Sequence, residues 1–224
     1  MLMKWIHWLS SLLFPDKCVL CGKVLEKDVL DLCRHCRTHV EVCGLPREKL
    51  PFLDSWVALW YYEGNVRRSL LRYKFHGRQS YAGSYGRLLS MKLLREERAD
   101  YDLITYVPIS AQRRRKRGFD QVELLANEVS AQLGIPCVVT LKKVRHNRPQ
   151  SGIAGHAQRR ANVLGAYQVT DGKALQGKKI LLLDDIVTTG ATAGEAARVL
   201  LTAGASQVHL AVIARANHEN KSGR

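Results

Sequence analysis

One segment, residues 180–192, constrains the fold of this chain more than any other. It reads Ile-Leu-Leu-Leu-Asp-Asp-Ile-Val-Thr-Thr-Gly-Ala-Thr. The apolar run 180–183 is typical of a strand that is buried on both faces of a parallel sheet. Ligands of such sheets bind outside the carboxyl ends of the strands. We therefore expect a ligand in the loop that follows Leu183.

The side chains of this loop suit a sugar phosphate. Asp184 and Asp185 offer carboxylates that accept hydrogen bonds from vicinal hydroxyls or hold Mg²⁺. A helical pattern begins at Thr192, so a phosphate in the loop would face the positive end of a helix. Phosphate next to diol is the pattern of a 5′-phosphorylated ribose. The group that we call the cradle consists of Asp184, Asp185, Thr188, Thr189, Gly190, Ala191 and Thr192.

The cradle resembles the binding motif of the type I phosphoribosyltransferases. This resemblance implies that Asp184 and Asp185 are the catalytic carboxylates, which contact the ribose hydroxyls. It also implies that residues 188–192 hold the 5′-phosphate of phosphoribosyl pyrophosphate. Two other interpretations stay open: an ordinary strand, turn and capped helix, because Asp and Thr favour helix N-termini, and a site that binds its ligand without catalysis.

Two pairs of cysteines near the amino terminus predict a metal site. Cys18 and Cys21 form one pair, Cys33 and Cys36 form the other, and eleven residues separate the pairs. Two-residue spacers let four thiolates face one tetrahedral ion, most simply a structural Zn²⁺. Two disulfides are the competing interpretation, but they need an oxidising compartment, and residues 1–14 make a poor export signal. We assign no role to Cys43 and Cys137.

The charge of the chain predicts an anionic partner. The 224 residues carry a formal net charge of +15, which attracts polyanions without sequence readout. A charge run is usually a solvated surface, but the largest one follows a predicted strand and is expected at the same sheet edge as Asp184. Candidates for contacts with nucleic acid or pyrophosphate are Arg113, Arg114, Arg115, Lys116, Arg117, Gln121 and Arg148.

Hydrophobic periodicity predicts an α/β fold. Strands are expected at residues 55–62, 103–107, 136–141, 180–183 and 208–214, and helices at 66–74, 79–98, 120–133 and after 192. Alternating strands and helices indicate a parallel sheet flanked by helices. We expect Phe119 to be buried and residues 143–162 to form a mobile loop of the kind that often acts as a lid.

The length allows one substantial domain and a small one. The boundaries that we expect are 1–50 for an amino-terminal helix with the zinc segment, 51–216 for the phosphoribosyltransferase-like domain, and 217–224 for a flexible tail. No apolar run approaches the length of a membrane span. The apolar face expected in residues 1–14 more often packs onto its own domain than onto a membrane.

An ordered set of motifs widens the resemblance to nearly the whole chain. The cysteine pairs are followed by Lys74-Phe-His-Gly-Arg78, Val107-Pro-Ile-Ser110, Arg117-Gly-Phe-Asp-Gln121, Arg148-Pro-Gln-Ser151 and the cradle. In this order they resemble the ComF family of competence-associated proteins. The resemblance implies a zinc finger fused to a type I phosphoribosyltransferase-like domain. It also implies a role in natural transformation, in which single-stranded DNA enters the cytoplasm across the inner membrane beside a helicase-like partner.

The same resemblance assigns further residues. It implies that the pyrophosphate-binding loop consists of Val107, Pro108, Ile109 and Ser110, and that residues 145–158 form a flexible hood over the site. It implies Mg²⁺ together with the sugar phosphate, and a cytoplasmic location with peripheral contact to the inner membrane as an alternative. One departure is that we recognise no pocket for a nucleobase or amine acceptor.

Three functions are therefore open. The first is a DNA-uptake protein that binds single-stranded DNA on its basic surface and phosphoribosyl pyrophosphate, or a related sugar phosphate, in the cradle. The second is an active phosphoribosyltransferase that acts on an amine or a nucleobase. The third is a zinc-dependent protein-interaction module with a vestigial cradle.

Overall fold

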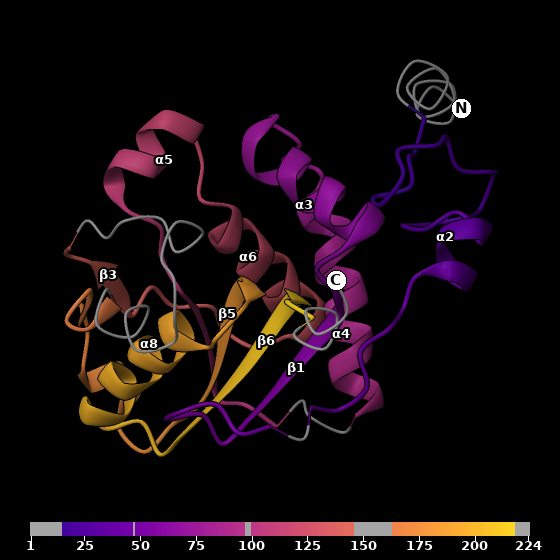
Figure 1. Ribbon diagram of the computed structural model, residues 1–224. Coiled ribbons are helices and arrows are strands. Elements are labelled where there is room, and N and C mark those ends of the chain that lie inside the picture. Colours follow the sequence, from indigo (N-terminus) through magenta and orange to yellow (C-terminus); the bar gives the residue numbers. More distant parts are fainter. Residues whose placement is uncertain (1–14, 47, 97–99, 146–162, 218–224) are drawn as a thin grey trace, which may run out of the picture.

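A parallel sheet lies at the centre of the fold (Figure 1). The computed structural model describes residues 15–46, 48–96, 100–145 and 163–217. Within these ranges the sheet has the strand order β1-β6-β5-β2, and β3 pairs antiparallel with β4 in a second, small sheet. The strands are β1 (Ser55–Tyr61), β2 (Leu103–Tyr106), β3 (Leu141–Lys143), β4 (Tyr167–Val169), β5 (Lys179–Val187) and β6 (Gln207–Arg215). The helices are α2 (Arg34–His39), α3 (Gly64–Phe75), α4 (Tyr81–Arg95), α5 (Ala111–Arg117), α6 (Gln121–Leu133), the 3-10 turn η2 (Lys173–Leu175) and α8 (Ala191–Thr202).

Helices cover both faces of the sheet, as the sequence predicts. Alternate residues of each strand point to opposite faces, so Leu181 and Leu183 of β5 pack against α3, α4 and α6, whereas Ile180 and Leu182 pack against α8 and the small sheet. All four side chains are fully buried. The prediction of a parallel sheet flanked by helices is confirmed.

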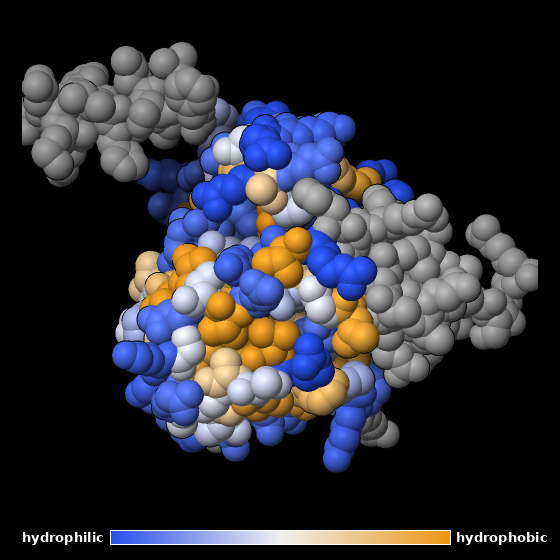
Figure 2. All heavy atoms as spheres, turned by 90° about the vertical axis from the view of Figure 1, so that its left-hand side faces the viewer, coloured by the Kyte–Doolittle hydropathy of each residue, from blue (hydrophilic) through white to orange (hydrophobic). Residues whose placement is uncertain are grey.

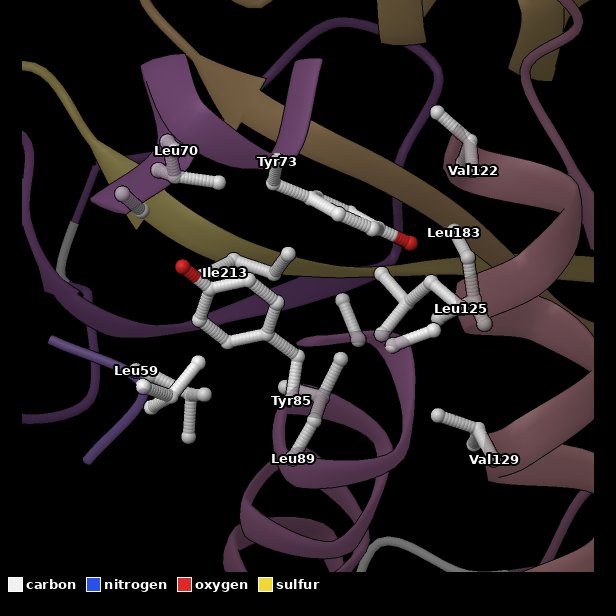
Figure 3. Packing of buried hydrophobic residues seen from close by; sticks show 14 of the residues in the cluster. Leu59, Leu70, Tyr73, Tyr85, Leu89, Val122, Leu125, Val129, Leu183 and Ile213 are labelled. Atoms are coloured by element: carbon white, nitrogen blue, oxygen red, sulfur yellow. The ribbon is translucent and has the colours of Figure 1, made fainter. Parts of the chain in front are cut away.

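Tyrosines from two helices fill the larger of the two cores (Figure 3). Tyr73 of α3 and Tyr85 of α4 meet edge to face, with ring centroids 5.4 Å apart. Leu125 of α6 and Leu183 of β5 pack in the same cluster. The hydroxyl of Tyr73 donates to the carbonyl oxygen of Gln121 at 2.5 Å, so the core also fixes the start of α6.

The acidic pair lies within β5, and the expected loop begins later than predicted. β2 ends where Tyr106 pairs with Leu183, but β5 continues beside β6 as far as Val187. The prediction that the loop follows Leu183 directly is therefore wrong by four residues. Pairing with one neighbour is enough to keep this end of β5 extended, and it leaves the β2 side of the acidic pair open to the segment that follows β2.

Two other expectations need correction. The predicted strand at residues 136–141 is reduced to a single bridge between Cys137 and Ile104, because Pro136 has no N–H to donate and the chain then turns away to form β3. The basic run was not assigned to a helix, yet it forms α5. The expectation for Phe119 is confirmed, since this side chain is buried.

Several predicted features lie outside the described residues. These are the amphipathic face in residues 1–14, most of the lid and hood, Arg148, and all but the first residue of the tail. No helix in the described ranges is long and apolar enough to cross a membrane.

Candidate functional site

The two aspartates of the cradle point to opposite faces of the sheet. Asp185 follows Leu183 on the side of α3 and α6, and Asp184 follows Leu182 on the side of the small sheet. Their surroundings differ accordingly: Asp185 is 7% exposed, whereas Asp184 is half-buried.

Both carboxylate oxygens of Asp185 have partners within the protein. Lys74 Nζ of α3 lies 2.7 Å from Oδ1, and Gln121 Nε2 of α6 donates to Oδ2 at 2.7 Å. Arg117 Nη1 in turn donates to Gln121 Oε1 at 2.6 Å. Asp185 therefore ties α3 and α6 to the end of β5.

Asp184 keeps most of its hydrogen-bonding capacity. Its carboxylate accepts a hydrogen bond from the backbone N–H of Asp185, which donates to Oδ1 at 2.8 Å. Burial and the adjacent charge of Asp185 raise the pKa of Asp184 to about 8, although Lys74 and Lys143 act in the opposite direction. A carboxylate held in this way gains from a ligand hydroxyl or a cation that stabilises its charge.

The rest of the cradle forms the turn between β5 and α8. Gly190 has a φ of 72°, a left-handed conformation that residues with a side chain adopt at a cost. A Cβ at Gly190 would also lie 2.6 Å from Leu50 Cδ2. The α8 helix begins at Ala191, so the N–H groups of its first turn point toward the preceding turn, where Ala191 N donates to Thr189 Oγ1 at 3.5 Å. This is the arrangement that binds phosphate at helix N-termini.

The segment predicted to bind pyrophosphate lies beside the acidic pair. It leaves the sheet where Val107 N donates to the carbonyl oxygen of Leu183 at 2.9 Å. Ile109 N donates to Asp120 Oδ2 at 2.9 Å, and Asp120 Oδ1 accepts from Val122 N at 2.9 Å. Asp120 is buried, and it joins this loop, residues 107–110, to the start of α6.

The basic run splits into an inner and an outer side. Arg113 and Arg117 are half-buried, whereas Arg114, Arg115 and Lys116 are exposed. Burial lowers the pKa of Lys143 in the small sheet, and the nearby positive charge of Arg113 lowers it further. Arg114 forms an ion pair with Glu123 of α6 at 2.8 Å. Figure 1 shows α5 and α3 rising above the carboxyl edge of the sheet on either side of β5.

The structure thus brings the cradle, residues 107–110, Arg113, Arg117 and Gln121 to one edge of the sheet. Lys74 and Asp120 lie within motifs quoted from the sequence, but neither was identified there as a site residue. Asp120 precedes a helical pattern, which is the signal of an N-cap, but no local signal connects Lys74 with a carboxylate 111 residues away.

The four predicted metal ligands lie together. The sulfur atoms of Cys18, Cys21, Cys33 and Cys36 are all within 4.8 Å of one another. Cys21 Sγ and Cys33 Sγ are 3.7 Å apart, and a zinc ion bound tetrahedrally at about 2.3 Å separates its sulfur ligands by about 3.8 Å. The cysteines are free thiols. Their chemistry and spacing fit one zinc ion, with every ligand position filled by protein.

The cysteine segment, residues 15–46, shares the larger core with the sheet. Val19 and Leu20 are buried in the same cluster as Tyr85. Arg72 Nη2 of α3 donates to the carbonyl oxygen of Leu20 at 2.6 Å, and Arg87 of α4 pairs with the buried Asp31. The segment is therefore part of the folded unit and not an appendage.

Comparison with known proteins supports this description. The model of the phosphoribosyl transferase domain family matches residues 123–223. Competence protein F of Haemophilus influenzae is 26% identical over 209 residues, which cover 89% of this chain and 90% of that protein. DNA utilization protein YhgH of Salmonella typhimurium is 29% identical over 209 residues, covering 88% and 89%. Competence protein ComFC of Bacillus subtilis is 27% identical over 192 residues, covering 84% and 72%.

The resemblance to the ComF family is confirmed. Among solved structures, the allosteric regulatory enzyme of purine biosynthesis aligns with a TM-score of 0.43 and 21% identity, covering 63% of this chain and 29% of that one. The matches to the competence and DNA utilization proteins run over 84–89% of this chain.

Proposed function

We propose that this ComF-like protein handles incoming single-stranded DNA during natural transformation. Its cradle binds phosphoribosyl pyrophosphate, or a related sugar phosphate, together with Mg²⁺. The exposed side of α5 binds the DNA backbone. Three relatives are named as competence or DNA utilization proteins, which supports the biological role.

One observation carries the ligand proposal. The half-buried carboxylate of Asp184, the turn before α8 and the loop 107–110 converge at the end of β5. A diol-binding carboxylate and a phosphate-binding helix start, with a second loop beside them, suit a ribose with phosphates at both ends.

The residues at this edge also suit Mg²⁺. Mg²⁺ prefers oxygen ligands and usually combines one or two carboxylates with phosphate oxygens and water. Asp184 is the carboxylate with free capacity, because both oxygens of Asp185 already have partners. A bound Mg²⁺ would supply positive charge against the pyrophosphate, while Asp184 orients the ribose hydroxyls.

The test is a calorimetric titration with phosphoribosyl pyrophosphate, with and without Mg²⁺. We expect saturable binding by the wild type and at least about tenfold weaker binding by Asp184→Asn, the loss of one charge-assisted hydrogen bond. The matched control is Asp100→Asn, because Asp100 lies on the surface beside Lys179 and outside the cradle. No binding by the wild type in either condition would refute the ligand proposal.

A phosphoribosyltransferase activity is the second candidate. The loop 107–110, fixed by Asp120 beside the acidic pair, favours it because a departing pyrophosphate needs such a position. Release of pyrophosphate in the presence of a nucleobase or amine, abolished by Asp184→Asn, would support this candidate.

The cellular setting is part of the same proposal. We place the protein in the cytoplasm at the inner membrane, beside a helicase-like partner that receives the DNA. Recovery of such a partner after cross-linking in competent cells, dependent on the four cysteines, tests this part.

A further inference from the structure

Phe75 is an exposed aromatic ring next to the candidate site. It ends α3, directly after Lys74, which binds Asp185. The residue is 60% exposed. A single exposed apolar side chain needs no explanation by itself. Phe75 differs from such a residue because the guanidinium of Arg117, which belongs to the candidate site, contacts its ring.

The guanidinium of Arg117 covers part of the Phe75 ring. Its central carbon lies 4.7 Å from the ring centroid, within the range of a cation–π contact. Arg117 is itself held in place, since its Nη1 donates to Gln121 Oε1 and Gln121 donates to Asp185. The Phe75 ring and the Arg117 guanidinium are two planar groups in contact, and Gln121 connects Arg117 to Asp185.

Two successive residues of α3 therefore act at the same site. Lys74 Nζ lies 2.7 Å from the carboxylate of Asp185. Phe75 contacts Arg117, which is linked to the same carboxylate through Gln121. Lys74 is largely buried, whereas Phe75 keeps most of its surface in solvent. The exposed ring consequently stands at the border between the cradle and the basic helix α5.

We propose that Phe75 and Arg117 form a stacking platform for a nucleobase. An aromatic ring and a guanidinium plane both stack on bases without selecting their sequence. This inference rests on the proposed function, and it supplies the base-binding element that the sequence does not reveal. The base belongs either to a single-stranded DNA or to a mononucleotide, and the chemistry of stacking is the same.

The variant for the test is Phe75→Leu, which removes the aromatic face and keeps an apolar side chain that favours helix. Its matched control is Phe75→Tyr, which keeps the ring. The probes are a short oligodeoxythymidylate, an abasic strand of the same length, thymidine monophosphate and phosphoribosyl pyrophosphate. Because the residue is exposed, neither change should disturb the fold, and a thermal melt of each variant checks this.

We expect Phe75→Leu to weaken oligodeoxythymidylate binding about tenfold, the effect of losing one stacked base. Binding of the abasic strand and of phosphoribosyl pyrophosphate should not change, and Phe75→Tyr should bind like the wild type. A parallel loss for thymidine monophosphate identifies a mononucleotide site. A loss confined to the oligonucleotide identifies a base of the DNA strand.

Two results would overturn the platform: unchanged oligodeoxythymidylate binding by Phe75→Leu, or equal weakening for the thymidine and abasic strands. Failure of the proposed function is distinct from both. In that case the wild type would bind neither phosphoribosyl pyrophosphate nor the abasic strand, whatever residue stands at position 75.

Discussion

At the scale of single residues, the adjacent carboxylates of the cradle have different roles. Asp185 holds two helices through Lys74 and Gln121, and its carboxylate has little capacity for a ligand. Asp184 faces the other side of β5, where burial and its neighbour's charge raise its pKa to about 8. A substitution at each position should therefore change a different property.

The first prediction concerns Asp184 and pH. The folded-state pKa of about 8 lies above the unfolded value of about 4. The unfolded chain thus releases this proton at lower pH than the folded chain, so the contribution of Asp184 to stability falls as pH rises from about 4 to about 8. The asparagine of Asp184→Asn does not titrate, so the variant does not lose this contribution to stability as pH rises. We expect the variant to gain stability relative to the wild type across this window, as measured by urea unfolding at several pH values.

Comparison with the wild type at each pH removes the contributions of titrating groups that do not interact with Asp184. A difference in unfolding free energy that stays constant from pH 5 to pH 9 would contradict the raised pKa.

The second prediction concerns the ion pair between Lys74 and Asp185. Both side chains are largely buried, so removing one partner leaves an uncompensated polar group. We expect Lys74→Met and Asp185→Asn each to lower the unfolding free energy by about 2 kcal/mol, and a double-mutant cycle to give a coupling of about 1–2 kcal/mol. Additive effects of the two changes would show that the ion pair contributes nothing to stability.

Sequence patterns identify the acidic pair but not what surrounds it. The cradle is a contiguous string, so its composition and order are visible in the sequence. The contacts of Asp185 come from residues 64 and 111 positions away. Only the packing of α3 and α6 on the sheet brings them together, and no local pattern encodes that packing.

At the scale of elements, α5 connects the candidate site with the basic surface. Ser110 caps its first turn, accepting from Arg113 N at 3.3 Å, and Gly118 ends it in a left-handed conformation. Both are recognised helix signals. The helix was not predicted because its run of cations has no apolar periodicity, and none of its residues is buried.

The third prediction concerns the outer face of α5. Arg115 and Lys116 are exposed, and each phosphate contact to a single strand contributes about 0.7 to the slope of log affinity against log salt. We expect Arg115→Gln with Lys116→Gln to reduce that slope by about 1.4, and phosphoribosyl pyrophosphate binding to stay unchanged. Fluorescence anisotropy of labelled single-stranded DNA at several salt concentrations measures the slope.

The control removes two charges from the opposite edge of the sheet. Lys173 lies in η2 and Lys178 lies just before β5, so neither is near the carboxyl ends of the strands. Equal loss of slope in Lys173→Gln with Lys178→Gln would mean that DNA responds to net charge and not to α5.

At the scale of the whole molecule, the cysteine segment is part of the core that supports the site. Ser69 of α3 donates to the carbonyl oxygen of Val19 and is hydrogen-bonded to Tyr85. Tyr85 packs against Tyr73, whose hydroxyl binds the backbone of Gln121. The sequence predicts the metal site, but it does not predict this packing, because the expected domain boundary separates the two parts.

The fourth prediction follows from that packing. Removing the metal should destabilise the whole protein and not the cysteine segment alone. We expect Cys36→Ser, or a strong chelator, to lower the melting temperature by about 10 °C, equivalent to about 3 kcal/mol for a chain of this size. The matched control is Cys137→Ser, because Cys137 lies outside the metal cluster.

The measurement is a calorimetric melt together with the zinc content. Loss of zinc that leaves the main transition in place would mean that the segment unfolds separately.

The last prediction concerns coupling between the two ligands. Ser110, at the end of the loop 107–110, caps α5, so a pyrophosphate on this loop would lie against the helix that we assign to DNA. Arg113 and Arg117 belong to that helix and lie on its side toward the site. Arg117 is also the cationic member of the stacking platform that it forms with Phe75. Two anions that share these cations compete, because each neutralises charge that the other needs.

We therefore expect phosphoribosyl pyrophosphate with Mg²⁺ to raise the dissociation constant for single-stranded DNA by about tenfold, a coupling of about 1.4 kcal/mol. By linkage, DNA must weaken phosphoribosyl pyrophosphate binding by the same factor. Titrating DNA at increasing ligand concentration measures the first factor, and calorimetry with saturating DNA measures the second. In Asp184→Asn the shift should disappear while DNA binding remains. A DNA affinity unaffected by saturating ligand would mean that the strand follows a path away from α5, and that the cradle and the DNA surface act independently.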